Sequence, residues 1–135
     1  MTQIDLSALQ HVTYQHMPQD VHLITFQHAT REAVDEYIQL MDRIYDGLTE
    51  TDMVRLIIDY RQSGIPPMRH LAQQGVKWAN SLSIHPTARM AILHQPDLGI
   101  SLLGLLVRSY NFGHLSTRFF KDEAGYQASL DWLHA

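Results

Sequence analysis

Two short apolar runs, each next to a segment with helical spacing, constrain the fold more than any other feature of the chain. Residues 53–59 are too short and too continuously apolar for a surface helix, and they suit a central strand covered on both faces. Residues 88–94 are expected to form another short strand. Strands that alternate with helices indicate right-handed crossovers and a mostly parallel sheet. We therefore expect the α/β class.

The first part of the chain predicts a β-hairpin followed by a helix. Residues 11–17 and 21–27 are rich in β-branched and aromatic side chains and are separated by Pro-Gln-Asp. The first of these strands is expected to be an antiparallel edge. From Thr30, a suitable N-cap, apolar residues recur at the spacing of one helix face until Gly47, which suits the helix stop.

The second half of the chain continues the alternation. Pro66 and Pro67 suit the first turn of a helix, in which Gly75 is expected to allow a close approach to the sheet. A third helix is expected over residues 97–110, a last strand over 114–120 and a closing helix after Asp122. The predicted order is ββαβαβαβα, with a mixed, mostly parallel five-stranded sheet and four helices.

Length and charge limit the classes of partner. With 135 residues, 45% of them hydrophobic, the chain should form one domain over residues 11–135, preceded by a polar lead over residues 1–10. Ten basic residues are scattered among 14 acidic ones, which gives a net charge of −4. This pattern argues against nucleic acid or an anionic membrane as the main partner.

The absence of cysteine excludes disulfides, thiolate metal sites and cysteine nucleophiles. The first residues lack the basic and apolar regions of a secretory signal, so a cytoplasmic location is expected. The most apolar window, residues 98–107, is about half the roughly 20 residues that a helix needs to cross a bilayer, so no membrane span is expected.

The third predicted helix is apolar on nearly all sides, although a helix on one face of a sheet should have a polar face as well. The side chains expected to remain uncovered are Leu98, Leu102, Leu105, Leu106 and Tyr110. A contiguous apolar patch usually marks a contact surface. Three explanations remain open: a homodimer interface, burial within the domain, or a groove for an apolar ligand.

The sequence LIIDYRQSG leads from the apolar run into a polar turn that contains Asp59, Arg61, Ser63 and Gly64. Such a turn is first a strand-to-helix connection, in which the aspartate accepts hydrogen bonds from backbone amides. Because open α/β sheets bind ligands at the carboxyl ends of their strands, the turn is also a candidate docking surface. Three basic residues lie in or after this turn, and they form either a small basic rim or a solvated helix face: Arg61, Arg69 and Lys77.

Three polar residues are expected at the carboxyl edge of the sheet: His28, Asp59 and His94. Two imidazoles and a carboxylate suit a metal ion or an acid–base pair, so a small enzyme or metal protein is the alternative function. No catalytic or phosphate-binding motif organises the chain, and we assign no catalytic, cofactor or metal residue. The histidines of the hairpin are interpreted as surface residues with at most incidental metal affinity; they are His11, His16, His22 and His28.

The order of elements, the LIID strand entering a polar turn, and the ending RFFKDEA with LDWL are similar to SpoIIAA-like STAS domains, also described as STAS/SEC14-like. The resemblance covers residues 11–135. It implies a cytoplasmic, non-catalytic binding or regulatory module, as in anti-sigma factor antagonists, and its SEC14-like side suggests a lipid-like ligand. The antagonists switch partners by phosphorylation of a serine at the start of the second helix. The matching residues 65–70 contain no serine. Ser63 lies in the turn, about five residues before the expected position of the phosphorylated serine.

Overall fold

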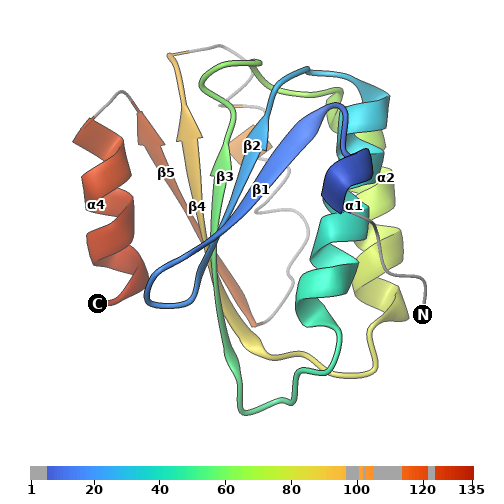
Figure 1. Ribbon diagram of the computed structural model, residues 1–135, viewed down its shortest axis with the longest axis vertical. Helices are drawn as coiled ribbons and strands as arrows, with labels where there is room; N and C mark the ends of the chain where they lie inside the picture. The colour runs from blue at the N-terminus through green and yellow to red at the C-terminus, as the bar shows by residue number, and fades with distance from the viewer. Residues whose placement is uncertain (1–5, 97–100, 102, 105–113, 122–123) are drawn as a thin grey trace.

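The computed structural model describes residues 6–96, 101, 103–104, 114–121 and 124–135. A 3-10 turn, η1 (Leu6–Ala8), leads into the strands, which are β1 (Val12–Met17), β2 (Val21–Phe26), β3 (Met53–Asp59), β4 (Thr87–His94) and β5 (Leu115–Lys121). The α-helices in this part of the chain are α1 (Arg31–Tyr45), α2 (Met68–Ser81) and α4 (Ala124–Leu133). Figure 1 shows them around one sheet.

The five strands lie in the order β1-β2-β3-β4-β5, so each strand pairs with its neighbours in the chain. β1 pairs antiparallel with β2, while β2, β3, β4 and β5 run parallel. The predicted hairpin, antiparallel edge and mostly parallel sheet are confirmed. The α/β class is confirmed as well, although most of the expected helix over residues 97–110 lies outside the described residues.

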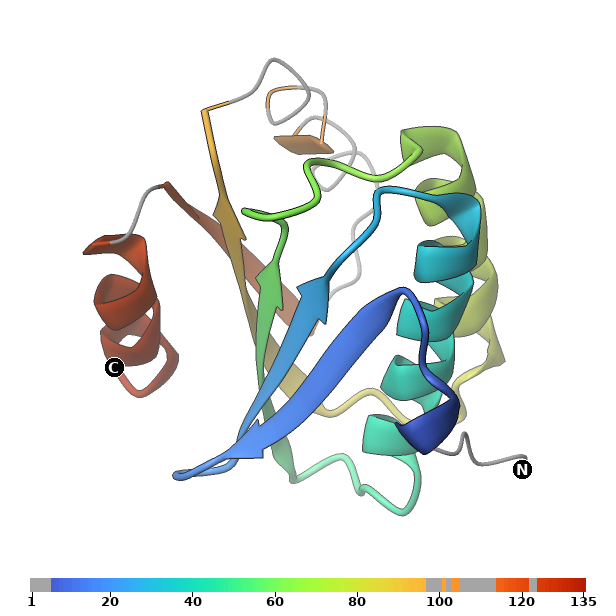
Figure 2. The same cartoon turned by 45° about the horizontal axis from the view of Figure 1, so that its top comes forward.

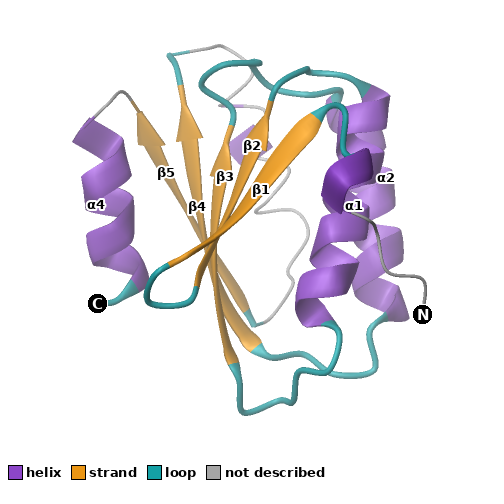
Figure 3. Cartoon of the chain, in the orientation of Figure 1, coloured by secondary structure: helices purple, strands orange, loops and turns teal. Residues whose placement is uncertain are grey.

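The sheet separates two layers of helix. α1 and α2 lie side by side on one face and α4 lies on the other, as the two views and the secondary-structure colouring show (Figures 1, 2 and 3). Side chains alternate along each strand, so Ile24 and Phe26 of β2 join the core under α1 and α2, while Val21 joins the smaller core under α4. β3 and β4 contribute to both cores, which explains their continuous apolar sequences.

α1 begins and ends as its sequence indicates. The Thr30 hydroxyl accepts a hydrogen bond from the Ala33 amide at 3.2 Å, which satisfies one of the free N–H groups of the first turn. Gly47 follows the helix with φ of +80°, a backbone conformation that glycine adopts without steric cost. Glu36, on the second turn, accepts hydrogen bonds from the amides of Gln10, His11 and Val12 and so holds the entry to β1 against α1.

α4 is held to the opposite face through its carboxyl end. Nε of Arg55 donates to the Leu133 carbonyl at 2.9 Å, and Nη1 of Arg89 donates to the Trp132 carbonyl at 2.7 Å. Cations near the last carbonyls also complement the helix dipole. Within the described ranges, no helix is both long and apolar enough to traverse a bilayer.

Candidate functional site

A cavity of about 400 Å³ lies on the sheet face that carries α1 and α2. Its walls come from α1, from α2 and from the facing residues of the sheet, and Leu103 also lines it. The largest side chains in the lining are Tyr37, Tyr45, Tyr60, Trp78, Met90 and Leu103. Among the described lining residues there is no aspartate, glutamate, lysine or arginine. The cavity therefore suits an apolar molecule.

The cavity lies beside α2, which buries fewer side chains than α1 does. α1 buries six residues, whereas α2 buries His70 alone. Nε2 of His70 lies 2.7 Å from Oδ1 of Asp35, so a polar contact joins α2 to α1. The inner face of α2 carries Ala72, Gly75 and Ala79, which are too small to fill the space between the helix and the sheet.

Gly75 corrects one expectation from the sequence. We expected this glycine to allow a close approach between its helix and the sheet. A Cβ atom placed on Gly75 would meet nothing within 4 Å, so no close approach occurs there. The missing side chain instead leaves open space in the cavity wall.

Tyrosine hydroxyls in the cavity wall remain protonated at neutral pH. Burial raises the pKa of Tyr45 from 10.0 to about 12. Burial also raises the pKa of Tyr60, and raises that of Tyr37 well above its usual value, with smaller contributions from neighbouring phenols at Tyr37. These groups can donate or accept a hydrogen bond, but they are not poised to act as bases.

Trp78 supplies a polar group without a partner. Its Nε1 atom is buried and has no hydrogen-bond partner among the described residues. Its ring meets that of Tyr45 edge to face, with centroids 4.9 Å apart. A buried donor that lacks an acceptor costs about 1–3 kcal/mol, so a ligand atom that accepts this hydrogen bond would recover that energy.

The exposed lining residues mark where the cavity meets solvent. Asn80 ends the helical part of the wall, and His85 and His114 precede β4 and β5 at the amino edge of the sheet. The two imidazole rings stack with centroids 5.9 Å apart and an interplanar angle of 11°. The mouth is therefore polar while the walls are apolar.

The turn after β3 contains several internal hydrogen bonds. The Asp59 carboxylate accepts from the Arg61 amide at 2.9 Å and from Nε and Nη2 of Arg61 at 3.0 and 2.9 Å. Ser63 donates to the Gly64 carbonyl, and Gly64 has φ of +82°. The expected connection, with an aspartate accepting from a backbone amide, is present; a docking role for Asp59, Arg61, Ser63 and Gly64 stays a prediction.

His28, Asp59 and His94 are not brought together as a ligand set. His28 is exposed and its Nδ1 lies 3.0 Å from Nδ1 of His11, while Asp59 binds Arg61. His94 is buried and its Nδ1 contacts the Gln95 carbonyl. Within the part of the chain that the structure covers, these residues are absent from any group of three close metal-ligating atoms. The expected placement is present, since Asp59 and His94 end β3 and β4 and His28 follows β2, but the three residues form no close ligand group. An enzymatic or metal-binding role for them stays a prediction.

A different group of polar residues does come together at the hairpin. His16, Asp20 and His22 place one ligand atom each within 4.8 Å of the others. Burial lowers the pKa of the His22 imidazole, the His16 ring lowers it further, and Asp20 opposes both effects. From the sequence, we interpreted these histidines as surface residues with at most incidental metal affinity, and we did not group them with Asp20.

The apolar residues Leu98, Leu102, Leu105, Leu106 and Tyr110 lie outside the described residues. Leu103, from the same predicted helix, is buried and lines the cavity. On the described surface the single exposed large hydrophobic side chain is Leu6. Self-association through the third predicted helix therefore stays a prediction.

The residues that sequence reasoning missed are those of the cavity, above all Trp78, His85 and His114. Their signal in the sequence is weak, because they come from three separate segments. The small residues at positions 72, 75 and 79 are a partial signal, since they recur on one helix face beside Trp78.

Comparison with known proteins supports the fold. The chain is similar to the crystal structure of an uncharacterized protein from the DUF3478 family, with a SpoIIAA-like fold, from Shewanella loihica PV-4. The TM-score is 0.59 and the identity 19%, and the match covers 96% of this chain and 99% of that chain. No family model matches the chain, and no curated protein matches it. The fold is therefore SpoIIAA-like.

Proposed function

We propose that this protein is a non-catalytic binding module that holds an apolar small molecule in the cavity between α1, α2 and the sheet. The observation that carries the proposal is the cavity itself, whose volume of about 400 Å³ lies in the range of small-molecule sites. Binding is favoured over catalysis because the walls offer protonated phenols and aliphatic groups, with no carboxylate among the described lining residues, while His85 and His114 lie at the exposed end.

The distribution of polar groups suggests the chemistry of the ligand. The walls accept an aliphatic or aromatic body, and the buried Nε1–H of Trp78 favours a ligand with a hydrogen-bond acceptor. His85 and His114, at the exposed end, suit a polar or acidic head group. An elongated molecule such as a fatty acid combines these features, in agreement with a lipid-like ligand.

A regulatory role is the second part of the proposal. Filling the cavity would join α2 to the sheet through the ligand, and so change the surface near the third predicted helix, of which Leu103 lines the cavity. Ligand occupancy would then control protein–protein contact, including the homodimer expected through Leu98, Leu102 and their neighbours. The module is proposed to act in the cytoplasm.

The experiment uses the two tryptophans as reporters, one on each face of the sheet. Trp78 lines the cavity, whereas Trp132 lies on α4 and packs with the opposite core. Dodecanoate is titrated into the Trp132→Phe and Trp78→Phe variants while tryptophan fluorescence is followed. We expect a saturable change in Trp132→Phe and none in Trp78→Phe. A change of equal size in both variants, or in neither, would contradict the proposal.

A pair of substitutions on α2 supplies the control. Ala72→Leu adds bulk to the cavity wall, whereas Gln73→Leu adds the same side chain at the next, exposed position. We expect Ala72→Leu to reduce dodecanoate binding at least tenfold, roughly the effect of 1.4 kcal/mol, and Gln73→Leu to bind as the parent does. Equal affinities for the two variants would place the ligand elsewhere.

A further inference from the structure

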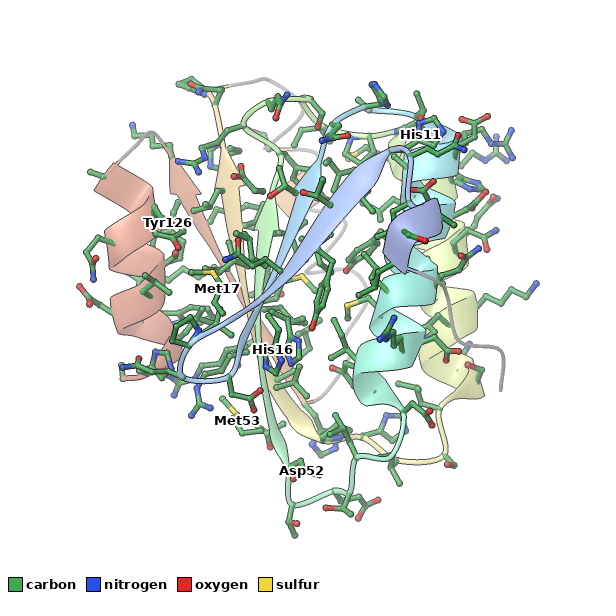
Figure 4. The ribbon with its side chains drawn as sticks, viewed as in Figure 1. His11, His16, Met17, Asp52, Met53 and Tyr126 are labelled. Carbon is green, nitrogen blue, oxygen red and sulfur yellow. The ribbon has the colours of Figure 1, made fainter. Side chains whose placement is uncertain are left out.

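The β1–β2 hairpin places two imidazoles and a carboxylate together on one face of the sheet. His16 and His22 are directly paired across the two strands, so their side chains project to the same side. Asp20 lies in the connection, two residues before His22. Figure 4 shows His16 on the side of β1 toward α1, whereas Met17 points to the α4 side near Tyr126.

The distances between these groups are close to those of a coordination shell. Nε2 of His16 lies 2.7 Å from Oδ1 of Asp20, and Nε2 of His22 lies 3.7 Å from the same oxygen. Around a tetrahedral ion with bonds of about 2.0–2.2 Å, ligand atoms lie about 3.3 Å apart. Small rotations of the exposed His16 and Asp20 side chains would therefore bring all three atoms to one ion.

The backbone and the ring contacts hold this arrangement in place. Gln19 and Asp20 have φ of 64° and 60°, which turn the chain so that the Asp20 carboxylate returns over the strands. The rings of His16 and His22 stack with centroids 4.4 Å apart. The Tyr14 hydroxyl lies 2.6 Å from Nδ1 of His22, and an N–H donated from Nδ1 to that oxygen leaves Nε2 free to bind a metal.

We propose that His16, Asp20 and His22 form a binding site for a divalent transition-metal ion of the zinc type. Two imidazole nitrogens and one carboxylate oxygen suit Zn²⁺, Co²⁺, Ni²⁺ and Cu²⁺, and they disfavour Mg²⁺ and Ca²⁺, which take mainly oxygen ligands. Three protein ligands leave at least one coordination position for water or another molecule. The ion binds in place of the hydrogen bond between His16 and Asp20, and it fastens the edge strand β1 to β2.

The site is independent of the cavity. Its residues do not line the cavity, and they do not include His28, Asp59 or His94 at the carboxyl edge of the sheet. Failure of dodecanoate to bind would therefore not contradict the metal site, and failure of the metal to bind would not contradict the apolar ligand site.

The experiment is a calorimetric titration of untagged, metal-free protein with Zn²⁺, Ni²⁺ and Co²⁺, with Mg²⁺ as the comparison. We expect one ion per chain, tighter binding of Ni²⁺ than of Co²⁺, and no competition from excess Mg²⁺. His16→Gln and Asp20→Asn should each weaken Zn²⁺ binding at least about tenfold. Asparagine tolerates the positive φ at position 20, so the hairpin should keep its shape.

The neighbouring histidine pair gives a matched control. His11 and His28 also lie close, with Nδ1 atoms 3.0 Å apart, but they belong to no described group of three ligand atoms. A His11→Gln/His28→Gln double variant should bind Zn²⁺ as the parent does. If this variant loses binding, or if His16→Gln and Asp20→Asn keep it while circular dichroism shows all four proteins folded, the proposed site is wrong.

Discussion

Tyr45 illustrates how the cavity affects single residues. Burial raises the pKa of its phenol from 10.0 to about 12, so the folded state retains this proton more firmly than the unfolded state does. The stability that this group contributes is complete below the unfolded pKa of 10.0 and is lost as the pH rises toward 12. In that interval, Tyr45 should lower the free energy of unfolding by up to about 1.4 kcal/mol per pH unit.

Urea unfolding of the parent and of Tyr45→Phe, measured on both sides of pH 10, tests this expectation. Phenylalanine keeps the ring beside Trp78 and removes the ionisable group. The loss of stability in alkali should be shallower in the variant. Equal slopes for the two proteins would mean that the Tyr45 phenol is not buried in the folded state.

At the scale of elements, two helical glycines differ in the space beside their Cα atoms, which is open at Gly75 and filled at Gly125. Gly75 of α2 has open space where a Cβ would be, whereas a Cβ on Gly125 of α4 would lie 2.9 Å from the Cβ of Phe120. Gly75→Ala should stabilise the fold by about 0.5–1 kcal/mol through helix propensity. Gly125→Ala should destabilise it by about 1–3 kcal/mol through overpacking against β5.

Chemical unfolding of the two alanine variants, compared with the parent, measures both effects. The same substitution is made in each helix. The difference between the two changes in the free energy of unfolding therefore reports whether there is room for a Cβ atom at each position. Destabilisation by Gly75→Ala would show that α2 packs closely on the sheet, and the cavity would then not exist as described.

Elements whose signals are local could be predicted from the sequence. β3 was predicted over residues 53–59, and the structure gives Met53–Asp59, because a strand buried on both faces is continuously apolar and stops where polar residues begin. The start of α1 followed from Thr30, whose side chain caps the helix as its residue type suggests. The hairpin was predictable from β-branched runs on either side of Pro18.

The candidate sites could not be predicted because they depend on spacing between elements. A glycine at position 75 is compatible with a closely packed helix and with an open space beside the helix, and only the structure shows that the space is open. At the carboxyl edge, the backbone-amide contact of Asp59 was predicted, but its contact with the Arg61 guanidinium and the contact of His28 with His11 were not. His16 and His22 needed the register of the hairpin, since a shift of one residue would turn the two rings to opposite faces.

For the whole molecule, the account depends on the cavity being a site that is filled in the cell. Native mass spectrometry of the protein purified from cells tests this most directly, since one spectrum reports both the oligomeric state and any bound molecule. We predict a species heavier than the chain by the mass of one apolar molecule, which is absent from Ala72→Leu and present in Gln73→Leu. A parent protein that shows only the mass of the chain itself, even after incubation with dodecanoate, would contradict the account.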